Sequence, residues 1–279
     1  MAHADSPILR AALADQIAGS LAALRSARPL VQNITNYVSM DIVANALLAA
    51  GASPAMVHAR EEIDDFGSLI GALAINIGTL SADWVASMLA AAAGARDRGT
   101  PWVLDPVGAG ATRFRTETSL RLLELGPAVV RGNASEILAL AAALGLDAAA
   151  ARGKGVDSGN TADEAAAVAL ELACRLGCTV AATGAIDVVT DGARVVRFGN
   201  GSPLMAQVTA IGCSLSALVA AYCAVTDPFA ATCAAVAHVG ISGELAATAA
   251  SHPGSFRVAF IDRLSALDRS DVTERLVLS

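Results

Sequence analysis

Residues 127–136 read PAVVRGNASE, and this stretch decides the fold class. A short apolar, β-branched run typical of a buried strand ends at Arg131, and an Ala-rich run typical of a helix begins at Ala134. Asn133 can cap that helix, and Glu136 stands at its third position, as in a capping box. The stretch therefore predicts a strand that passes directly into a crossover helix, the building unit of a parallel sheet.

Short β-branched runs and long Ala- and Leu-rich runs alternate over most of the chain, which predicts an α/β fold with a mostly parallel central sheet flanked by helices. Residues 186–190 and 193–198, separated by Asp191 and Gly192, predict a hairpin with an Asp-Gly turn, after which the chain turns largely helical. We expect strands at 29–33, 54–58, 73–78, 101–105, 127–131 and 178–183. We expect helices at about 39–50, 81–98, 114–125, 134–144 and 161–177.

Length and composition predict one domain in an oligomer. A chain of 279 residues suits a single domain, because α/β folds often reach this length before they divide. The polar stretch 151–160 is short and predicts a loop at the surface or over a site rather than an interdomain linker. Apolar residues make up 54% of the chain and charged residues only 16%, so a second copy is expected to cover part of the surface. We therefore expect residues 1–279 to form one domain.

Charge and cysteine content limit the classes of partner and compartment. A net charge of -7 and a pI near 5.0, without a block of Lys or Arg, argue against a nucleic acid partner. The N-terminus, MAHADSPILR, lacks the cationic and apolar regions of a secretory signal, so we expect a cytoplasmic protein. The five cysteines are odd in number and lie mostly in apolar runs, which suits buried thiols rather than disulfides.

The apolar run at 208–225 raises the question of a membrane span, since about 20 such residues can cross a bilayer. It contains Thr209 and Gly212, lacks flanking Lys or Arg, and is followed closely by Asp227. These features favour a buried core helix, and we expect no membrane association.

Residues that follow the predicted strands are the candidates for a functional site. Ligands of open α/β sheets bind beyond the carboxyl ends of the strands. The residues at these ends are unusually polar and Gly-rich for so apolar a chain. They are 33–36, Met56, 76–79, 105–110, 131–136, and Thr183 with Gly184.

Residues 105–110, DPVGAG, place a carboxylate at the end of an apolar strand and follow it with a flexible loop. Asp105 fits a turn cap as well as a ligand position. If a triphosphate binds at this edge, Arg131 can hold its oxygens as a planar fork. Asp105 and Glu136 can then supply oxygens to Mg²⁺, directly or through water, and the capping role of Glu136 is compatible with this.

Residues 209–216, TAIGCSLS, run from a small-residue turn into a long apolar helix. Free backbone N–H groups at a helix start, together with the helix dipole, can hold a transferring phosphoryl group. Cys213 lies in the first turn, where the same field favours the thiolate and predicts a lowered pKa. The alternative is a buried structural cysteine, and the four histidines show no motif spacing that would supply Cys213 with a base.

Several of these segments, in the same order, resemble the hydroxyethylthiazole kinase family. The likeness extends over roughly residues 25 to 265, and GSFRVAFIDRL at 254–264 is similar to the family's C-terminal helix. The matching segments are QNITN at 32–36, GASPAMV at 51–57, DPVGAG at 105–110, RGNASE at 131–136, TG at 183–184 and TAIGCSLS at 209–216.

The resemblance implies a three-layer ribokinase-like fold and transfer of the ATP γ-phosphate to the primary alcohol of hydroxyethylthiazole, with Mg²⁺, in thiamine biosynthesis and salvage. It also implies a homotrimer whose alcohol sites lie at subunit boundaries. Cys213 matches the family's catalytic cysteine, which stands where most ribokinase-like enzymes have an Asp base. The resemblance assigns Asn36, Val38, Met56 and Ala210 to the thiazole, Arg131, Thr183 and Gly212 to ATP, and Asp105 and Glu136 to the metal.

Position 210 departs from the family's usual Gly-x-Gly-Cys, because this chain has Ala210-Ile211-Gly212-Cys213. Gly permits positive φ and close approach of a ligand to the backbone, whereas Ala tolerates positive φ poorly. Either the turn at Ala210 is little strained or the phosphate pocket is altered. We expect the difference to affect the rate more than the type of reaction.

Two other functions stay open on the sequence alone. The fold also suits another small-alcohol kinase or a nicotinamide-hydrate dehydratase, although such dehydratases are expected to carry Asp at position 213. A non-catalytic thiazole- or nucleotide-binding protein is the third interpretation, and Ala210 motivates it. Fold by itself does not decide among these functions.

Overall fold

The computed structural model describes residues 7–146 and 161–279, and one sheet of eight strands crosses this part of the chain. The strands are β1 (Leu30–Ile34), β2 (Ser53–Ala55), β3 (Ala72–Asn76), β4 (Trp102–Asp105), β5 (Val129–Asn133), β6 (Thr179–Thr183), β7 (Asp187–Thr190) and β8 (Val195–Phe198). Their order is β2-β1-β3-β4-β5-β6-β7-β8, parallel from β2 to β6. The last two strands form the antiparallel hairpin that the Asp-Gly turn predicts.

Burial explains why the central strands are so apolar. Every residue of β3, β4 and β6 is buried, because helices cover both faces of the sheet. The edge strand β2 is shorter than predicted, with three residues where the sequence suggested 54–58. It contains Pro54, which has no N–H for a sheet ladder and so suits an edge. Each of the six predicted parallel strands is present.

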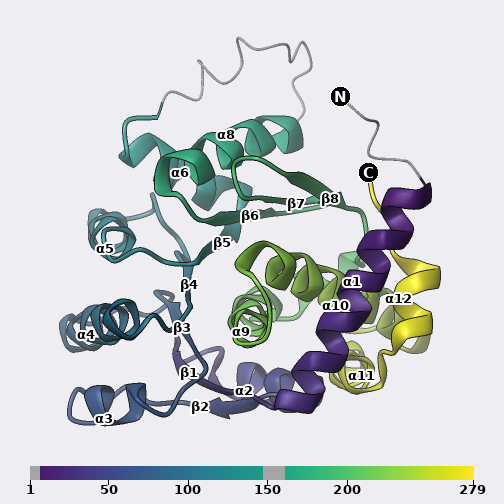
Figure 1. Ribbon diagram of the computed structural model, residues 1–279, viewed down its shortest axis with the longest axis horizontal. Helices are drawn as coiled ribbons and strands as arrows, with labels where there is room; N and C mark the ends of the chain where they lie inside the picture. Colours follow the sequence, from purple (N-terminus) through teal and green to yellow (C-terminus); the bar gives the residue numbers. More distant parts are fainter. Residues whose placement is uncertain (1–6, 147–160) are drawn as a thin grey trace.

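Helices cover the two faces of the sheet in separate layers (Figure 1). One layer holds α3 (Ile63–Gly67), α4 (Ala82–Arg98), α5 (Arg113–Leu123), α6 (Ala134–Ala143) and α8 (Thr161–Leu176). The other holds α1 (Pro7–Ala27), α2 (Met40–Ala50), the 3₁₀ turn η1 (Pro203–Gln207), α9 (Ile211–Cys223), α10 (Pro228–Ala249), α11 (Pro253–Ala266) and α12 (Arg269–Arg275). The predicted three-layer α/β architecture is therefore confirmed, and the five predicted crossover helices all form.

Two helices were not predicted from the sequence. In α1, the buried residues Ile17, Leu21 and Leu24 have helical spacing and form one face against the core. That helix precedes the first strand, so the strand-to-helix alternation gave no signal for it. Helix α3 has only five residues, too few for a periodic pattern.

The predicted capping box at the start of α6 forms as expected. The Asn133 side chain accepts from the backbone N–H of Glu136, and the Glu136 carboxylate accepts from the backbone N–H of Asn133. These reciprocal bonds satisfy two free donors at the helix start. They fix the transition from β5 to α6 at the carboxyl edge of the sheet.

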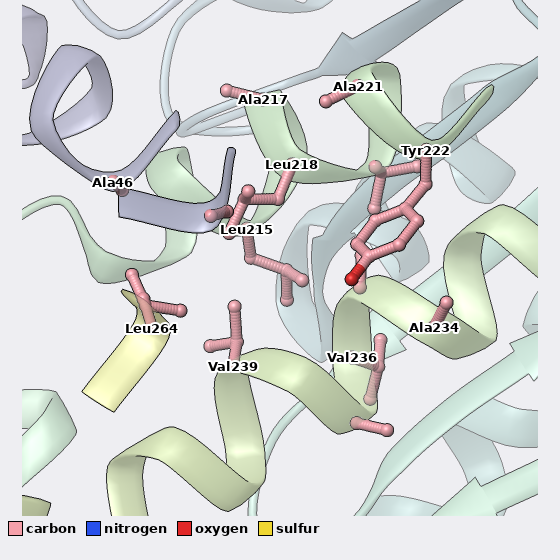
Figure 2. Packing of buried hydrophobic residues seen from close by; sticks show 14 of the residues in the cluster. Ala46, Leu215, Ala217, Leu218, Ala221, Tyr222, Ala234, Val236, Val239 and Leu264 are labelled. Atoms are coloured by element: carbon pink, nitrogen blue, oxygen red, sulfur yellow. The ribbon is translucent and has the colours of Figure 1, made fainter. Parts of the chain in front are cut away.

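The apolar run at 208–225 is a core helix, as predicted. Helix α9 packs against both the sheet and α10, and Figure 2 shows Leu215 and Leu218 of α9 in one cluster with Val239 of α10 and Leu264 of α11. Of the helices in the described ranges, α10 alone is long and apolar enough to cross a membrane, and 94% of its apolar window is buried inside the protein. Both apolar helices therefore belong to the interior.

All five cysteines are free, and three of them are buried, which agrees with the predicted absence of a disulfide framework. The predicted polar loop at 151–160 lies outside the described residues.

Candidate active site

Loops from the carboxyl ends of β1, β3, β4, β5 and β6 meet the first turn of α9 at one edge of the sheet. Hydrogen bonds and ion pairs join side chains from these separate segments. The edge is the one where open α/β sheets bind their ligands. Most of the predicted site residues therefore lie in one connected cluster.

Asp105, the last residue of β4, is the buried centre of this cluster and is 1% exposed. Its Oδ2 accepts from Asn76 Nδ2 at 2.7 Å and from Ser216 Oγ at 2.8 Å. Arg131 Nη1 lies 4.0 Å from the same oxygen. Burial raises the pKa of Asp105 to about 6, with a further contribution from the Glu136 carboxylate and opposition from Arg131. Among the described residues, Asp105 Oδ1 has no hydrogen-bond partner.

Arg131 brings together the residues assigned to ATP. Its Nη2 donates to Thr183 Oγ1 at 2.5 Å, and Thr183 Oγ1 donates to the Gly132 carbonyl oxygen at 3.3 Å. A Cβ at Gly212 would lie 2.7 Å from Arg131 Nη1, so the absence of a side chain there lets the guanidinium lie against the start of α9. Within the described ranges, Arg131 Nε has no hydrogen-bond partner. The guanidinium is thus held at one end and has donor capacity left for an anion.

Glu136 holds the DPVGAG loop against the start of α6. Its Oε2 accepts from the Asn133 N–H at 2.8 Å, and its Oε1 accepts from the Gly108 N–H at 2.9 Å. Both carboxylate oxygens are thus engaged by backbone donors, and each keeps a second lone pair. The residue links the helix cap to the loop that follows Asp105.

Cys213 lies at the third position of α9 and is half-buried. Its Sγ accepts from Asn36 Nδ2 at 3.5 Å. Burial raises the pKa of the Cys213 thiol to about 11, and the Asp105 carboxylate adds to this, while the Asn36 and Asn76 amides oppose it. The predicted lowering of the pKa is therefore wrong: desolvation and the nearby Asp105 carboxylate raise it instead.

Three of the four alcohol-side residues, Asn36, Val38 and Met56, lie in two adjacent loops. Asn36 is buried, and its Oδ1 accepts from the backbone N–H groups of Val38 at 3.1 Å and Ser39 at 3.0 Å. Val38 is 60% exposed. Met56 follows β2 directly and is half-buried, and the two loops are joined by the Thr35 N–H, which donates to His58 Nε2 at 3.3 Å.

Ala210 has the left-handed backbone conformation that its family counterpart, Gly, adopts without strain. It is the residue before α9, with φ 64° and ψ 14°. In the part of the chain that the structure describes, Arg28 is the one other non-glycine residue with positive φ. The turn is thus strained by about 1–2 kcal/mol. Of the two alternatives for this position, the little-strained turn is therefore wrong.

Four residues at this edge were not assigned a role from the sequence: Asn76, Ser216, Arg115 and Asp187. Asn76 stands at the end of a predicted strand, and Ser216 belongs to the TAIGCSLS motif, so the sequence had already marked both segments. Arg115 donates to the carbonyl oxygens of Ile77, Val107 and Gly78, and so joins two site loops.

Asp187 begins an antiparallel strand, so it was not among the candidates, which were chosen from the residues just after the predicted parallel strands. Its Oδ1 accepts from the Gly184 N–H at 2.9 Å. Burial raises the pKa of Asp187 to about 6, opposed by that hydrogen bond and by Arg131.

Sequence comparison decides the family. The profile of the hydroxyethylthiazole kinase family matches residues 21–270. The chain belongs to the hydroxyethylthiazole kinase family. It is 56% identical over 244 residues to a hydroxyethylthiazole kinase of Cereibacter sphaeroides, covering 88% of this chain and 91% of the relative. It is 52% identical over 261 residues to a hydroxyethylthiazole kinase of Rhizobium leguminosarum, covering 93% and 96%.

Solved structures agree with this membership. The hydroxyethylthiazole kinase protein from Pyrococcus horikoshii matches with a TM-score of 0.87 and 42% identity, covering 95% of this chain and 98% of that one. A ribokinase-like superfamily protein from Enterococcus faecalis matches with a TM-score of 0.60 at 12% identity, covering 88% and 89%, which supports the fold alone. The expected ribokinase-like fold and the expected membership among kinases of thiamine biosynthesis are both confirmed.

Proposed function

We propose that this hydroxyethylthiazole kinase transfers the γ-phosphate of ATP to the primary alcohol of hydroxyethylthiazole at the cluster around Asp105. The observation that carries the proposal is the connection of Cys213 and Asn36, on the alcohol side, to Asp105 and Arg131, on the nucleotide side, through polar contacts of 2.7 to 4.0 Å. Phosphoryl transfer depends mainly on alignment and charge stabilisation, which a rigid cluster of this kind supplies.

The nucleotide side has the donors that a triphosphate needs. Arg131 presents a planar fork with free donor capacity beside Thr183 and Gly212. Helix α9 begins without a side-chain cap, so its first backbone N–H groups are free for phosphoryl oxygens. We assign ATP to Arg131, Thr183 and Gly212 on these contacts.

The acidic residues fit a magnesium ion that arrives with ATP. No group of three or more acidic, His or Cys side chains forms a metal cage within the described ranges. Mg²⁺ usually needs only one or two carboxylates besides water and phosphate oxygens. Asp105 Oδ1 is buried without a partner, and the charges of Asp105 and Glu136 repel each other. Asp105 and Glu136 would hold the ion, which would neutralise phosphate charge.

Cys213 is a neutral thiol before the reaction, because its pKa is raised to about 11. It therefore orients the alcohol through hydrogen bonds. Because a neutral thiol already carries its proton, the hydroxyl proton leaves late, onto an oxygen of the transferring phosphoryl group, when the new P–O bond has made the hydroxyl acidic. A loose transition state requires little early deprotonation of the alcohol. Asn36 donates to the sulfur and so fixes its position beside the acceptor.

The acceptor side is open in a single chain. Val38 and its neighbour Tyr37 are 60% and 67% exposed, directly beside the buried Asn36. Exposed apolar side chains at the rim of a site suit coverage by another subunit. We therefore propose a homotrimer in which a second copy, together with Val38, Met56 and Ala210, encloses the thiazole.

The function is tested by ADP release from the purified protein with Mg-ATP and a panel of acceptors: hydroxyethylthiazole, hydroxymethylpyrimidine, pyridoxal and none. We expect turnover with the thiazole alone. Equal turnover with another alcohol would contradict the acceptor assignment. Tight binding of ATP and thiazole without ADP release would instead support a non-catalytic binding protein.

A further inference from the structure

Asn76 is the last residue of β3 and lies between the two halves of the proposed site. It is 4% exposed. Its Oδ1 accepts from Asn36 Nδ2 at 2.8 Å and from the Gly78 N–H at 2.9 Å. Its Nδ2 donates to Asp105 Oδ2 at 2.7 Å. One amide thus touches the residue beside the acceptor and the carboxylate on the nucleotide side.

Backbone donors fix the orientation of both amides. An N–H can only donate, so the Gly78 N–H identifies the atom of Asn76 that faces it as oxygen. In the same way, the N–H groups of Val38 and Ser39 identify Asn36 Oδ1. Asn36 therefore donates to Asn76, and Asn76 donates to Asp105, with no alternative assignment by an amide flip.

The backbone at Gly78 packs closely against this pair. A Cβ on Gly78 would lie 2.7 Å from Asn36 Nδ2, so the backbone after β3 lies directly against the Asn36 amide. The second proton of Asn36 Nδ2 points to Cys213 Sγ, at a donor-to-sulfur distance of 3.5 Å. The side-chain oxygen and nitrogen of both amides have hydrogen-bond partners, which hold Asn36 and Asn76 in one arrangement.

We propose that Asn76 is a positioning residue for phosphoryl transfer. It holds Asn36, and through it Cys213, at a fixed distance from the Asp105 carboxylate, so that the alcohol and the phosphoryl group are aligned. The inference rests on the proposed assignment of Cys213 and Asp105 to the reaction. It predicts that loss of the Asn76 amide disturbs both substrates at once, although Asn76 touches neither.

Ser216 and Asn36 provide matched controls, because each makes only one half of the connection. Ser216 Oγ donates to the same Asp105 oxygen but has no bond to the acceptor side. Asn36 reaches Cys213 but not Asp105. A third variant, Asn76→Asp, keeps an oxygen for Gly78 and Asn36 but replaces the donor to Asp105 by a carboxylate oxygen, which repels the Asp105 carboxylate.

The test is steady-state kinetics with both substrates varied, for Asn76→Ala, Asn76→Asp, Ser216→Ala and Asn36→Ala. We expect Asn76→Ala to lower kcat about 100-fold and to raise both KM values, because a small displacement of the reacting groups can lower the rate by about that factor. We expect Ser216→Ala and Asn76→Asp to change the KM for Mg-ATP while the KM for the thiazole stays within about 3-fold. Asn36→Ala should raise the thiazole KM and lower kcat, while the KM for Mg-ATP stays within about 3-fold.

Two outcomes separate failure of this inference from failure of the proposed function. If Cys213→Ala and Asp105→Asn lose turnover but Asn76→Ala keeps wild-type kcat and both KM values, Asn76 has no positioning role. If Cys213→Ala and Asp105→Asn also keep full turnover, the site itself is wrong. Thermal unfolding of each variant identifies loss of fold. If Asn76→Ala unfolds, Asn76→Asp and Ser216→Ala decide the question, and equal effects on both KM values in Asn76→Asp would contradict the inference.

Discussion

At the scale of single residues, Ala210 and Gly212 at the start of α9 are small residues for two different physical reasons. The backbone of Ala210 has a left-handed conformation, which is strained in a residue that has a Cβ. Gly212 has no such backbone requirement, but a Cβ there would collide with the Arg131 guanidinium. The two positions therefore call for opposite tests.

Ala210→Gly should stabilise the protein. Relief of the left-handed strain exceeds the added chain entropy of Gly, so we expect the free energy of unfolding to rise by about 0.5–1 kcal/mol. Urea denaturation measures the change. The exposed helical residue Ala86 is the control, because Ala86→Gly should lower the free energy of unfolding by about 1 kcal/mol. A loss of stability in Ala210→Gly would show that the turn is not strained.

Gly212→Ala should impair nucleotide binding without unfolding the protein. The new Cβ would lie 2.7 Å from Arg131 Nη1 and displace the guanidinium. We expect the Kd for ATP to rise about 10-fold, equivalent to about 1.4 kcal/mol, when measured by calorimetric titration. Gly19→Ala in α1 is the control, since a Cβ there meets no atom within 4 Å. Unchanged ATP affinity in Gly212→Ala would remove Arg131 from the nucleotide site.

At the scale of elements, the junction of α9, α10 and α11 depends on one buried histidine. His238 Nε2–H donates to the Leu264 carbonyl oxygen at 2.9 Å, so its Nδ1 accepts from the Tyr222 hydroxyl at 2.9 Å. Burial lowers the pKa of His238 from 6.5 to about 4. The neutral ring is thus part of the packing between three helices.

This junction should weaken at acid pH. Between pH 6.5 and about 4 the unfolded chain binds a proton that folded His238 does not, so stability falls as the pH falls, by up to about 3 kcal/mol. The buried carboxyls of Asp105 and Asp187 act in the opposite direction, because their pKa values are raised to about 6.

The difference between the wild type and His238→Gln isolates the histidine, and denaturant unfolding at several pH values measures it. We expect the variant to lose less stability than the wild type on acidification. Parallel pH curves would contradict the assignment.

The sequence predicted the helices and strands better than it predicted the contacts between their side chains. The strand-to-helix units formed because each carries its own local signal, such as the Asn133–Glu136 capping box. The polar network did not follow from local signals, since Asn36, Asn76 and Asp105 come from three separate strand ends that the sheet brings together. The wrong pKa for Cys213 has the same origin: its burial and its carboxylate neighbour depend on tertiary structure.

At the scale of the whole molecule, the open acceptor side predicts assembly. We expect a mass near three times the 28.0 kDa of the chain by light scattering. Val38→Glu should weaken the trimer and raise the thiazole KM together, because Val38 is exposed at the acceptor rim. Val258→Glu, at a 63% exposed position on α11, is the charge-matched control. A monomer with wild-type thiazole KM would contradict the shared site.

The central claim is that phosphoryl transfer takes place at the carboxyl edge of the sheet, around Asp105. The most direct test is thiazole-dependent ADP release by the wild type, Asp105→Asn and Cys213→Ala, measured side by side. We expect Asp105→Asn to lower kcat at least about 100-fold and Cys213→Ala to lower it by about 10- to 10⁴-fold, with folded protein in both cases. Full turnover by both variants would contradict the account.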